Sequence, residues 1–170
     1  MYQSLLSFKR QMRKHRKTYR RFLNSLKRKK IRIQPAESAM LNKEAFEKID
    51  CQQCANCCKR MTPVYTFPEI SRLADHLGIT DLEYSDKYLG KTSNGDIINR
   101  KQPCHFLDKN NRCTVYEIRP KSCRGFPYTH QKDFNRRLNT HLQNLDYCPI
   151  TFHVVQKMQE NLAAKAERAS

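Results

Sequence analysis

The chain has 170 residues, a net charge of +17 and a mean hydropathy of −0.85. It lacks the run of about eighteen apolar residues that a transmembrane helix needs, and its N-terminus lacks the apolar core of a secretory signal. This length fits one domain with appendages, and the low aliphatic content predicts a thin hydrophobic core.

The first predicted element is a basic helix. Residues 1–32 contain thirteen Lys or Arg and no Asp or Glu. Their apolar residues recur at steps of three and four, which places them on one stripe. The cationic faces predict contact with nucleic acid or an anionic surface, whereas the stripe predicts docking on the cysteine domain or on a second copy, which gives a homo-oligomer. A solvated basic helix without a ligand is the alternative, and the Lys-rich, Ser-poor composition disfavours an organelle transit peptide. The stripe consists of Leu5, Phe8, Met12, His15, Tyr19, Phe22 and Leu26.

Pro35 marks a linker, so we expect the basic helix and linker over 1–35, a cysteine domain over 36–150 and a C-terminal amphipathic helix over 151–170. Capping signatures begin helices at Thr66 and Thr80, and residues 38–49 and 134–145 also have helical spacing. Two short apolar runs predict a β-hairpin over residues 104–116. The expected fold is therefore mainly α with a small β-hairpin, in a compact domain stapled by metal.

Eight cysteines dominate the middle of the chain. Four lie within eight residues, and the other four are spread over the next ninety. In a chain without an export signal we expect cytoplasmic location and reduced thiols, which favours metal binding over disulfides. The predicted metal ligands are Cys51, Cys54, Cys57, Cys58, Cys104, Cys113, Cys123 and Cys148.

The spacing leaves the metal open. Three ligands in CxxCxxC suit an iron–sulfur cluster with one remote ligand, whereas a CxxC with a distant pair suits tetrahedral zinc. We favour iron–sulfur slightly, and the number of centres is open. Arg124, held close to Cys123 by Gly125 and Pro127, is the predicted cation that offsets the thiolate charge at the cofactor. His105 is expected to be a surface or supporting histidine, because neighbours in a hairpin point to opposite faces.

With these residues in hand, the chain resembles the CxxCxxCC-domain family of zinc- or iron-chelating cysteine-cluster proteins. The resemblance covers roughly residues 49–150 and is carried by Cys51-x2-Cys54-x2-Cys57-Cys58, Glu69-Ile70, Pro103-Cys104-x-Phe106-Leu107, Cys113-x-Val115-Tyr116-Glu117-x-Arg119-Pro120, Cys123-Arg124-x-Phe126-Pro127 and Cys148-Pro149. It implies eight metal-linked cysteines in the cytoplasm.

The residues account for metal binding and for no reaction, because no nucleotide-binding loop or hydrolase motif is present. We therefore expect a metal-binding protein that is not an enzyme. One alternative is an iron–sulfur enzyme related to flagellin lysine N-methylases, which contain a similar domain. The other is a nucleic-acid-associated metal scaffold that uses the basic arm.

Overall fold

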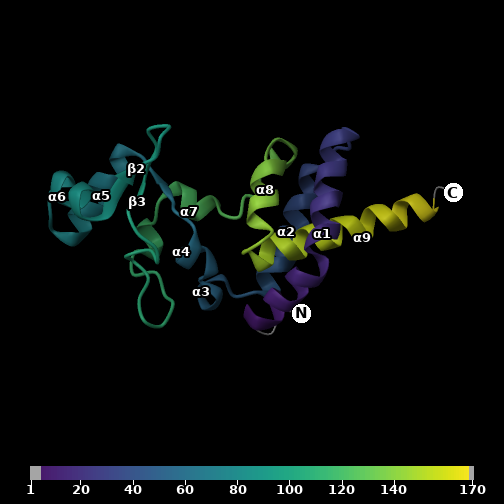
Figure 1. The fold of residues 1–170 in the computed structure, drawn as a ribbon, viewed down its shortest axis with the longest axis horizontal. Helices are drawn as coiled ribbons and strands as arrows, with labels where there is room; N and C mark the ends of the chain where they lie inside the picture. The colour runs from purple at the N-terminus through teal and green to yellow at the C-terminus, as the bar shows by residue number, and fades with distance from the viewer. Residues whose placement is uncertain (1–4, 169–170) are drawn as a thin grey trace. The chain divides into compact units, whose positions relative to one another are not determined.

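The computed structural model describes residues 5–168, and its elements are labelled in Figure 1. The chain divides into two units. Unit 1 combines the residues up to Cys54 with those from Pro127 onward, and unit 2 comprises Ala55–Phe126. The structure is mainly helical with one small antiparallel sheet, as predicted. None of the helices within residues 5–168 is long and apolar enough to cross a membrane.

Unit 1 is a helical assembly of segments from both ends of the chain. Helix α1 contacts α8 and α9, and α2 packs along α9. Its core includes Leu23, Leu145 and Val155, all of them fully buried. The elements of unit 1 are α1 (Leu5–Arg28), α2 (Pro35–Lys48), α3 (Cys51–Cys54), η2 (Phe134–Arg136), α8 (Leu138–Asn144) and α9 (Pro149–Arg168).

The apolar stripe of α1 is partly buried inside its own unit, with Phe8, Tyr19 and Leu26 buried and the other stripe residues half-buried. Phe8 and Tyr19 meet the ring of Phe152 in α9 edge-on, with ring centroids 5.7 and 4.9 Å apart. Arg16 also pairs with Asp146 at 2.7 Å, just before α9. The first four residues of the predicted basic helix lie outside the described residues. The stripe is thus used in the fold of unit 1, and the cationic side chains around it are left on the surface.

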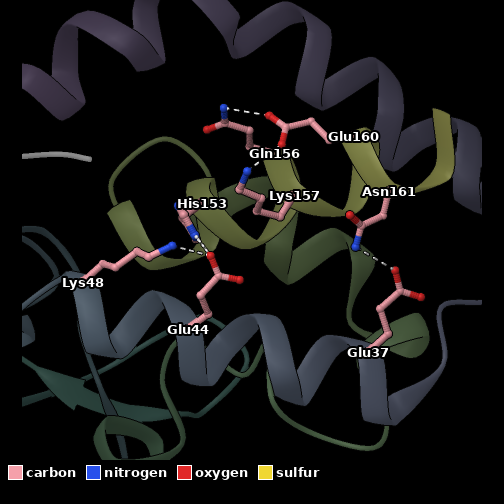
Figure 2. Close-up of polar contacts among 8 residues, drawn as sticks. All are labelled: Glu37, Glu44, Lys48, His153, Gln156, Lys157, Glu160 and Asn161. Carbon is pink, nitrogen blue, oxygen red and sulfur yellow. Dashed lines mark hydrogen bonds and ion pairs between the residues drawn. The ribbon is translucent and has the colours of Figure 1, made fainter. Parts of the chain in front are cut away.

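Polar contacts join α2 to α9 along the edge of their apolar contact (Figure 2). Glu44 of α2 lies between Lys48 of its own helix and His153 of α9, whose Nε2 is 3.5 Å from the carboxylate. Further along, Asn161 donates to Glu37 at 3.4 Å. These contacts hold α9 in register with α2, and so fix the start of α9, where Cys148 lies.

Unit 2 is built around a three-stranded antiparallel sheet of order β1-β3-β2, packed with two helices. The capping boxes predicted at Thr66 and Thr80 are both present, and Gly78, at φ 67°, ends the first helix in the left-handed conformation. The elements are α4 (Asn56–Arg60), β1 (Val64–Tyr65), α5 (Phe67–Leu77), α6 (Asp81–Tyr88), β2 (Leu89–Lys91), β3 (Ile97–Asn99), η1 (Tyr116–Ile118) and α7 (Lys121–Gly125).

The hairpin predicted over residues 104–116 is reduced to a turn with one antiparallel bridge, and the hairpin of the sheet lies at β2 and β3. Strands β2 and β3 form it, around the turn at Asn94-Gly95, where Gly95 has φ 84°. Residues 104–116 contain only a single bridge, between Leu107 and Cys113. The reason is local: the Asp108 carboxylate accepts backbone N–H groups of the following residues at 2.8 and 2.7 Å, and so curls this segment into a tight loop instead of a ladder.

Candidate metal centre

Both units contain cysteines. Cys148 is buried, and the others are half-buried. Unit 1 holds Cys51, Cys54 and Cys148, and unit 2 holds Cys57, Cys58, Cys104, Cys113 and Cys123.

Backbone hydrogen bonds bring three segments of unit 2 together at their cysteines. The N–H of Cys104 donates to the carbonyl of Cys58 in α4 at 2.8 Å. The carbonyl of Cys104 in turn accepts the N–H of Leu107 at 3.0 Å, and Leu107 bridges to Cys113. Helix α7 adds Cys123 from a fourth segment. Four thiols that are far apart in sequence therefore share one region of unit 2.

The charges of these four thiols act on one another. Burial, together with the negative charges that Cys104, Cys58 and Cys113 acquire on ionisation, raises the pKa of Cys123 to about 12. The pKa values of Cys104 and Cys113 are likewise raised by burial and, to a smaller extent, by the ionised forms of their cysteine neighbours. Several thiolates at this place therefore need a compensating positive charge.

Cys58 is the most acidic of this group. A hydrogen bond with the adjacent Cys57 thiol, at 3.9 Å between the sulfurs, lowers its pKa to about 7 against the effect of burial, with help from the charges of Arg119 and Lys59. Arg119 also acts on Cys113, and its guanidinium lies 3.6 Å over the ring of Tyr116. Arg124 is exposed, and its predicted role stays a prediction.

Sequence analysis named Arg119 only as part of the family pattern and gave it no role. The available signal was its position next to Pro120, which closes the loop between Cys113 and Cys123. Stacking on Tyr116 and a hydrogen bond to the Tyr116 carbonyl hold the guanidinium in place. Such a fixed cation beside two thiols lowers the free energy of their ionised forms.

Backbone amides point at the sulfurs in a repeated pattern. The N–H of Phe106 interacts with the Cys104 sulfur, and the N–H of Val115 interacts with the Cys113 sulfur. In each case the amide lies two residues after the cysteine. Both amides act to lower the pKa of the thiol, against the larger effect of burial. Amides directed at sulfur stabilise thiolate ligands, so the local backbone suits metal ligation.

Unit 1 places Cys148 immediately before α9. The Thr151 N–H donates to the Cys148 sulfur at 3.5 Å. Burial raises the pKa of Cys148 to about 12, with a further contribution from the charge of Cys51, so these two thiols are also neighbours. Cys51 opens α3, whose first N–H groups are capped by the Asp50 carboxylate at 2.9 and 3.2 Å.

The half-buried His105 contacts two tyrosines. Its Nε2 lies 3.0 Å from the Tyr84 hydroxyl, and its ring stacks on Tyr88 with centroids 4.3 Å apart. Burial lowers its pKa to about 4. A supporting position for His105 therefore fits its contacts.

The chemical type of the donor atoms suits a thiolate-bound metal. Among residues 5–168, no group of three or more His, Cys, Asp or Glu side chains is arranged as a coordination sphere. The donors that share one region of unit 2 are sulfurs alone, which suits zinc and iron–sulfur centres rather than calcium or magnesium. In addition, Asn99 Nδ2 and Thr151 Oγ1, each beside a cysteine, are buried polar atoms without another partner in the described part of the chain.

A family model named CxxCxxCC and described as "Putative zinc- or iron-chelating domain" matches residues 50–149. The chain belongs to this family. It is also 33% identical over 110 residues to MJ0661, an uncharacterised protein of Methanocaldococcus jannaschii. The aligned region covers 62% of this chain and 55% of that relative. The chain thus spans about half the length of the curated relative that it matches. No solved structure matches the chain.

The CxxCxxCC region includes all eight cysteines, from Cys51 to Cys148, and therefore draws on both units. It excludes α1, α2 and nearly all of α9. The basic helix α1 is thus an addition to the chelating domain, although its packing on α9 makes it part of the core of unit 1.

Proposed function

We propose that this CxxCxxCC protein binds zinc or an iron–sulfur centre through the thiolates of its cysteines, and that it acts as a metal-binding module and not as an enzyme. The observation that carries the proposal is that the backbone joins Cys104 to Cys58 and that the charges of Cys58, Cys104 and Cys113 raise the cost of ionising Cys123. A metal cation removes that cost, because it neutralises the thiolates together.

In this proposal those four thiols of unit 2 would hold one centre, and Cys51, Cys54 and Cys148 are the thiols that unit 1 would offer to a second. Arg119 and Lys59, and the predicted Arg124, would offset the residual negative charge. Zinc bound in this way supplies a structural cross-link, and an iron–sulfur cluster adds electron transfer. The sparse aliphatic core of the chain is consistent with a fold that gains stability from such cross-links.

Anaerobic purification with elemental analysis and a visible spectrum tests the proposal. We expect about one zinc ion, or one cluster, for every four cysteines. A brown protein with iron and acid-labile sulfide selects the iron–sulfur form, and with it the alternative of an iron–sulfur enzyme. A folded, colourless protein that contains no metal contradicts the proposal.

We propose as a second function that the surface of α1 binds nucleic acid. The supporting observation is that Phe8, Tyr19 and Leu26 of the apolar stripe are buried in unit 1, whereas most of the cations of α1 are exposed. Closely spaced cations without neighbouring acids match a phosphate backbone. The exposed basic residues on α1 include Arg10, Arg13, Lys14, Lys17, Arg21 and Arg28.

The test is fluorescence anisotropy with a single-stranded RNA and with a duplex DNA at several salt concentrations. Deletion of α1 would remove core residues, so substitutions are the correct tool. Changing Arg13, Lys17 and Arg21 together to Gln should weaken binding and reduce its salt dependence. The matched control changes Lys43, Lys132 and Arg136, which are exposed elsewhere in unit 1, to Gln. Equal effects of the two triple variants contradict a specific role for α1.

A further inference from the structure

Two buried polar groups face cysteine sulfurs and have no other partner. Asn99 is 2% exposed and Thr151 is fully buried. Neither Asn99 Nδ2 nor Thr151 Oγ1 has a hydrogen-bond partner within the described residues 5–168. Buried donors are almost always satisfied in native proteins, because water is not available to replace a missing acceptor. A thiolate next to each of them is such an acceptor.

The amide of Asn99 has its orientation set by a second strand. Asn99 ends β3, and its Oδ1 accepts a hydrogen bond of 2.5 Å from the hydroxyl of Tyr65 in β1. With the oxygen held by Tyr65, the Nδ2 group is the end of the amide that lacks a bond, and Cys104 packs against the apolar cluster that contains Tyr65. The Asn99 side chain acts there to lower the pKa of the Cys104 thiol, although burial and the other thiols keep that pKa raised.

Thr151 occupies the corresponding place in unit 1. It lies in the first turn of α9, three residues after Cys148, and its backbone N–H already donates to the Cys148 sulfur at 3.5 Å. The hydroxyl of the same residue acts on the same sulfur. Each unit therefore has one buried side-chain donor next to a cysteine: Asn99 next to Cys104 in unit 2, and Thr151 next to Cys148 in unit 1.

We propose that Asn99 and Thr151 are positioning residues that donate hydrogen bonds to the sulfurs of Cys104 and Cys148 when these sulfurs are metal-bound thiolates. The inference rests on the proposed metal-binding function. A neutral thiol is a weak acceptor and a thiolate is a strong one, so each donor gains a full hydrogen bond only in the metal-bound state. The two side chains thereby favour that state and orient its ligands.

Anaerobic titration with Co²⁺ tests the inference, because thiolate-bound Co²⁺ has a sulfur-to-metal charge-transfer band. The variants are Thr151→Val, which removes only the hydroxyl, and Asn99→Leu, which removes the amide. Each variant should weaken Co²⁺ binding at the centre in its own unit by about 10- to 100-fold. Loss of the hydrogen bond also raises the energy of the sulfur electrons, so the remaining charge-transfer band should move to longer wavelength.

Matched controls separate this effect from a general loss of buried hydrogen bonds. Thr129→Val removes a fully buried hydroxyl that donates to Asn42 at 2.7 Å, away from the thiols that the argument uses. Asn135→Leu removes an amide that is bonded to the backbone of Ile33. Both controls should keep the affinity and the band of the unmodified protein. Tyr65→Phe leaves Asn99 in place without its anchor and should give an intermediate loss, and it serves as the test if Asn99→Leu does not fold.

The outcomes distinguish this inference from the proposed function. If the unmodified protein takes up Co²⁺ and Thr151→Val and Asn99→Leu bind it equally tightly with an unshifted band, the positioning role is wrong and metal binding stands. If the controls lose as much affinity as the two variants, the positioning role is again wrong. If the unmodified protein takes up no Co²⁺, zinc or iron, both proposals are wrong.

Discussion

The carboxylate of Glu69 accepts the backbone N–H of Lys121 at 2.6 Å and so joins the first turn of α5 to the first turn of α7. Its other oxygen accepts the N–H and the hydroxyl of Thr66, both at 2.9 Å. One buried acid therefore caps two helices that are more than fifty residues apart in sequence. Through α7 it also fixes the segment that carries Cys123, one of the proposed ligands.

Replacing Glu69 with Gln should destabilise the protein by about 1–3 kcal/mol, because an amide cannot accept from all three donors and leaves at least one of them unsatisfied in a buried place. Urea unfolding of the metal-free protein, followed by circular dichroism, measures the change. The matched control is Glu83→Gln in the exposed capping box of α6, where the carboxylate contacts Thr80 alone among the bonds recorded for the described residues. Equal destabilisation by both substitutions would show that the link to Lys121 contributes nothing.

The buried His141 should make stability depend on pH. Burial lowers its pKa to about 4, below the usual value of about 6.5. The Phe134 backbone opposes this shift, the charge of Arg137 adds to it, and the charge of Asp133 opposes it. The unfolded chain therefore binds more protons between these two values. Stability is fully present above pH 6.5 and falls as the pH decreases toward 4, by at most about 1.4 kcal/mol per pH unit for this one group.

The measurement compares the metal-free protein with His141→Gln by urea unfolding at several pH values from 4 to 7.5. The difference between the two proteins isolates His141 from His153, whose pKa is also lowered by burial. We expect the variant to be less stable near neutral pH and to lose less stability on acidification. Parallel curves would mean that His141 titrates alike in the folded and unfolded chain.

Local signals in the sequence predicted the helices well, because caps and apolar spacing act over a few residues. Thr66 and Thr80 lie where the pattern predicts the helix boundaries. The hairpin predicted over residues 104–116 is reduced to one antiparallel bridge, since the Asp108 carboxylate takes backbone N–H groups of this loop, and such competition is not visible in an apolar pattern.

The surroundings of the thiols depend on contacts that are distant in sequence. The spacing of the cysteines predicted thiolate chemistry, but not that Cys58 and Cys104 would be joined through the backbone or that Asn99 would face a sulfur. Asn99 and Tyr65 look like ordinary strand residues in the sequence. Their roles arise only because β1 pairs with β3, which no local pattern specifies.

Replacing Cys123 with Ser should reduce the bound metal by about half, if the chain holds one centre in each of two cysteine sets. A serine hydroxyl is a poor ligand for zinc or iron at neutral pH, and the other three thiols of unit 2 then lack a partner. Elemental analysis after anaerobic purification measures the change. Ser71→Ala is the control in the same unit, since it removes a hydroxyl that donates to the Phe67 carbonyl at 3.3 Å but no sulfur. Full metal content in Cys123→Ser would remove this cysteine from the ligand set.

Replacing Arg119 with Met should weaken metal binding by about 10-fold, because it removes a fixed positive charge beside Cys58 and Cys113 while keeping an unbranched side chain over the Tyr116 ring. Competition with a chelator at fixed pH gives the affinity. Arg124→Met is the comparison, since sequence reasoning preferred that residue and its side chain is exposed. Screening by water makes an exposed charge less effective, so we expect the smaller loss in Arg124→Met. The reverse order would return the charge-compensating role to Arg124 and leave Arg119 with its packing on Tyr116.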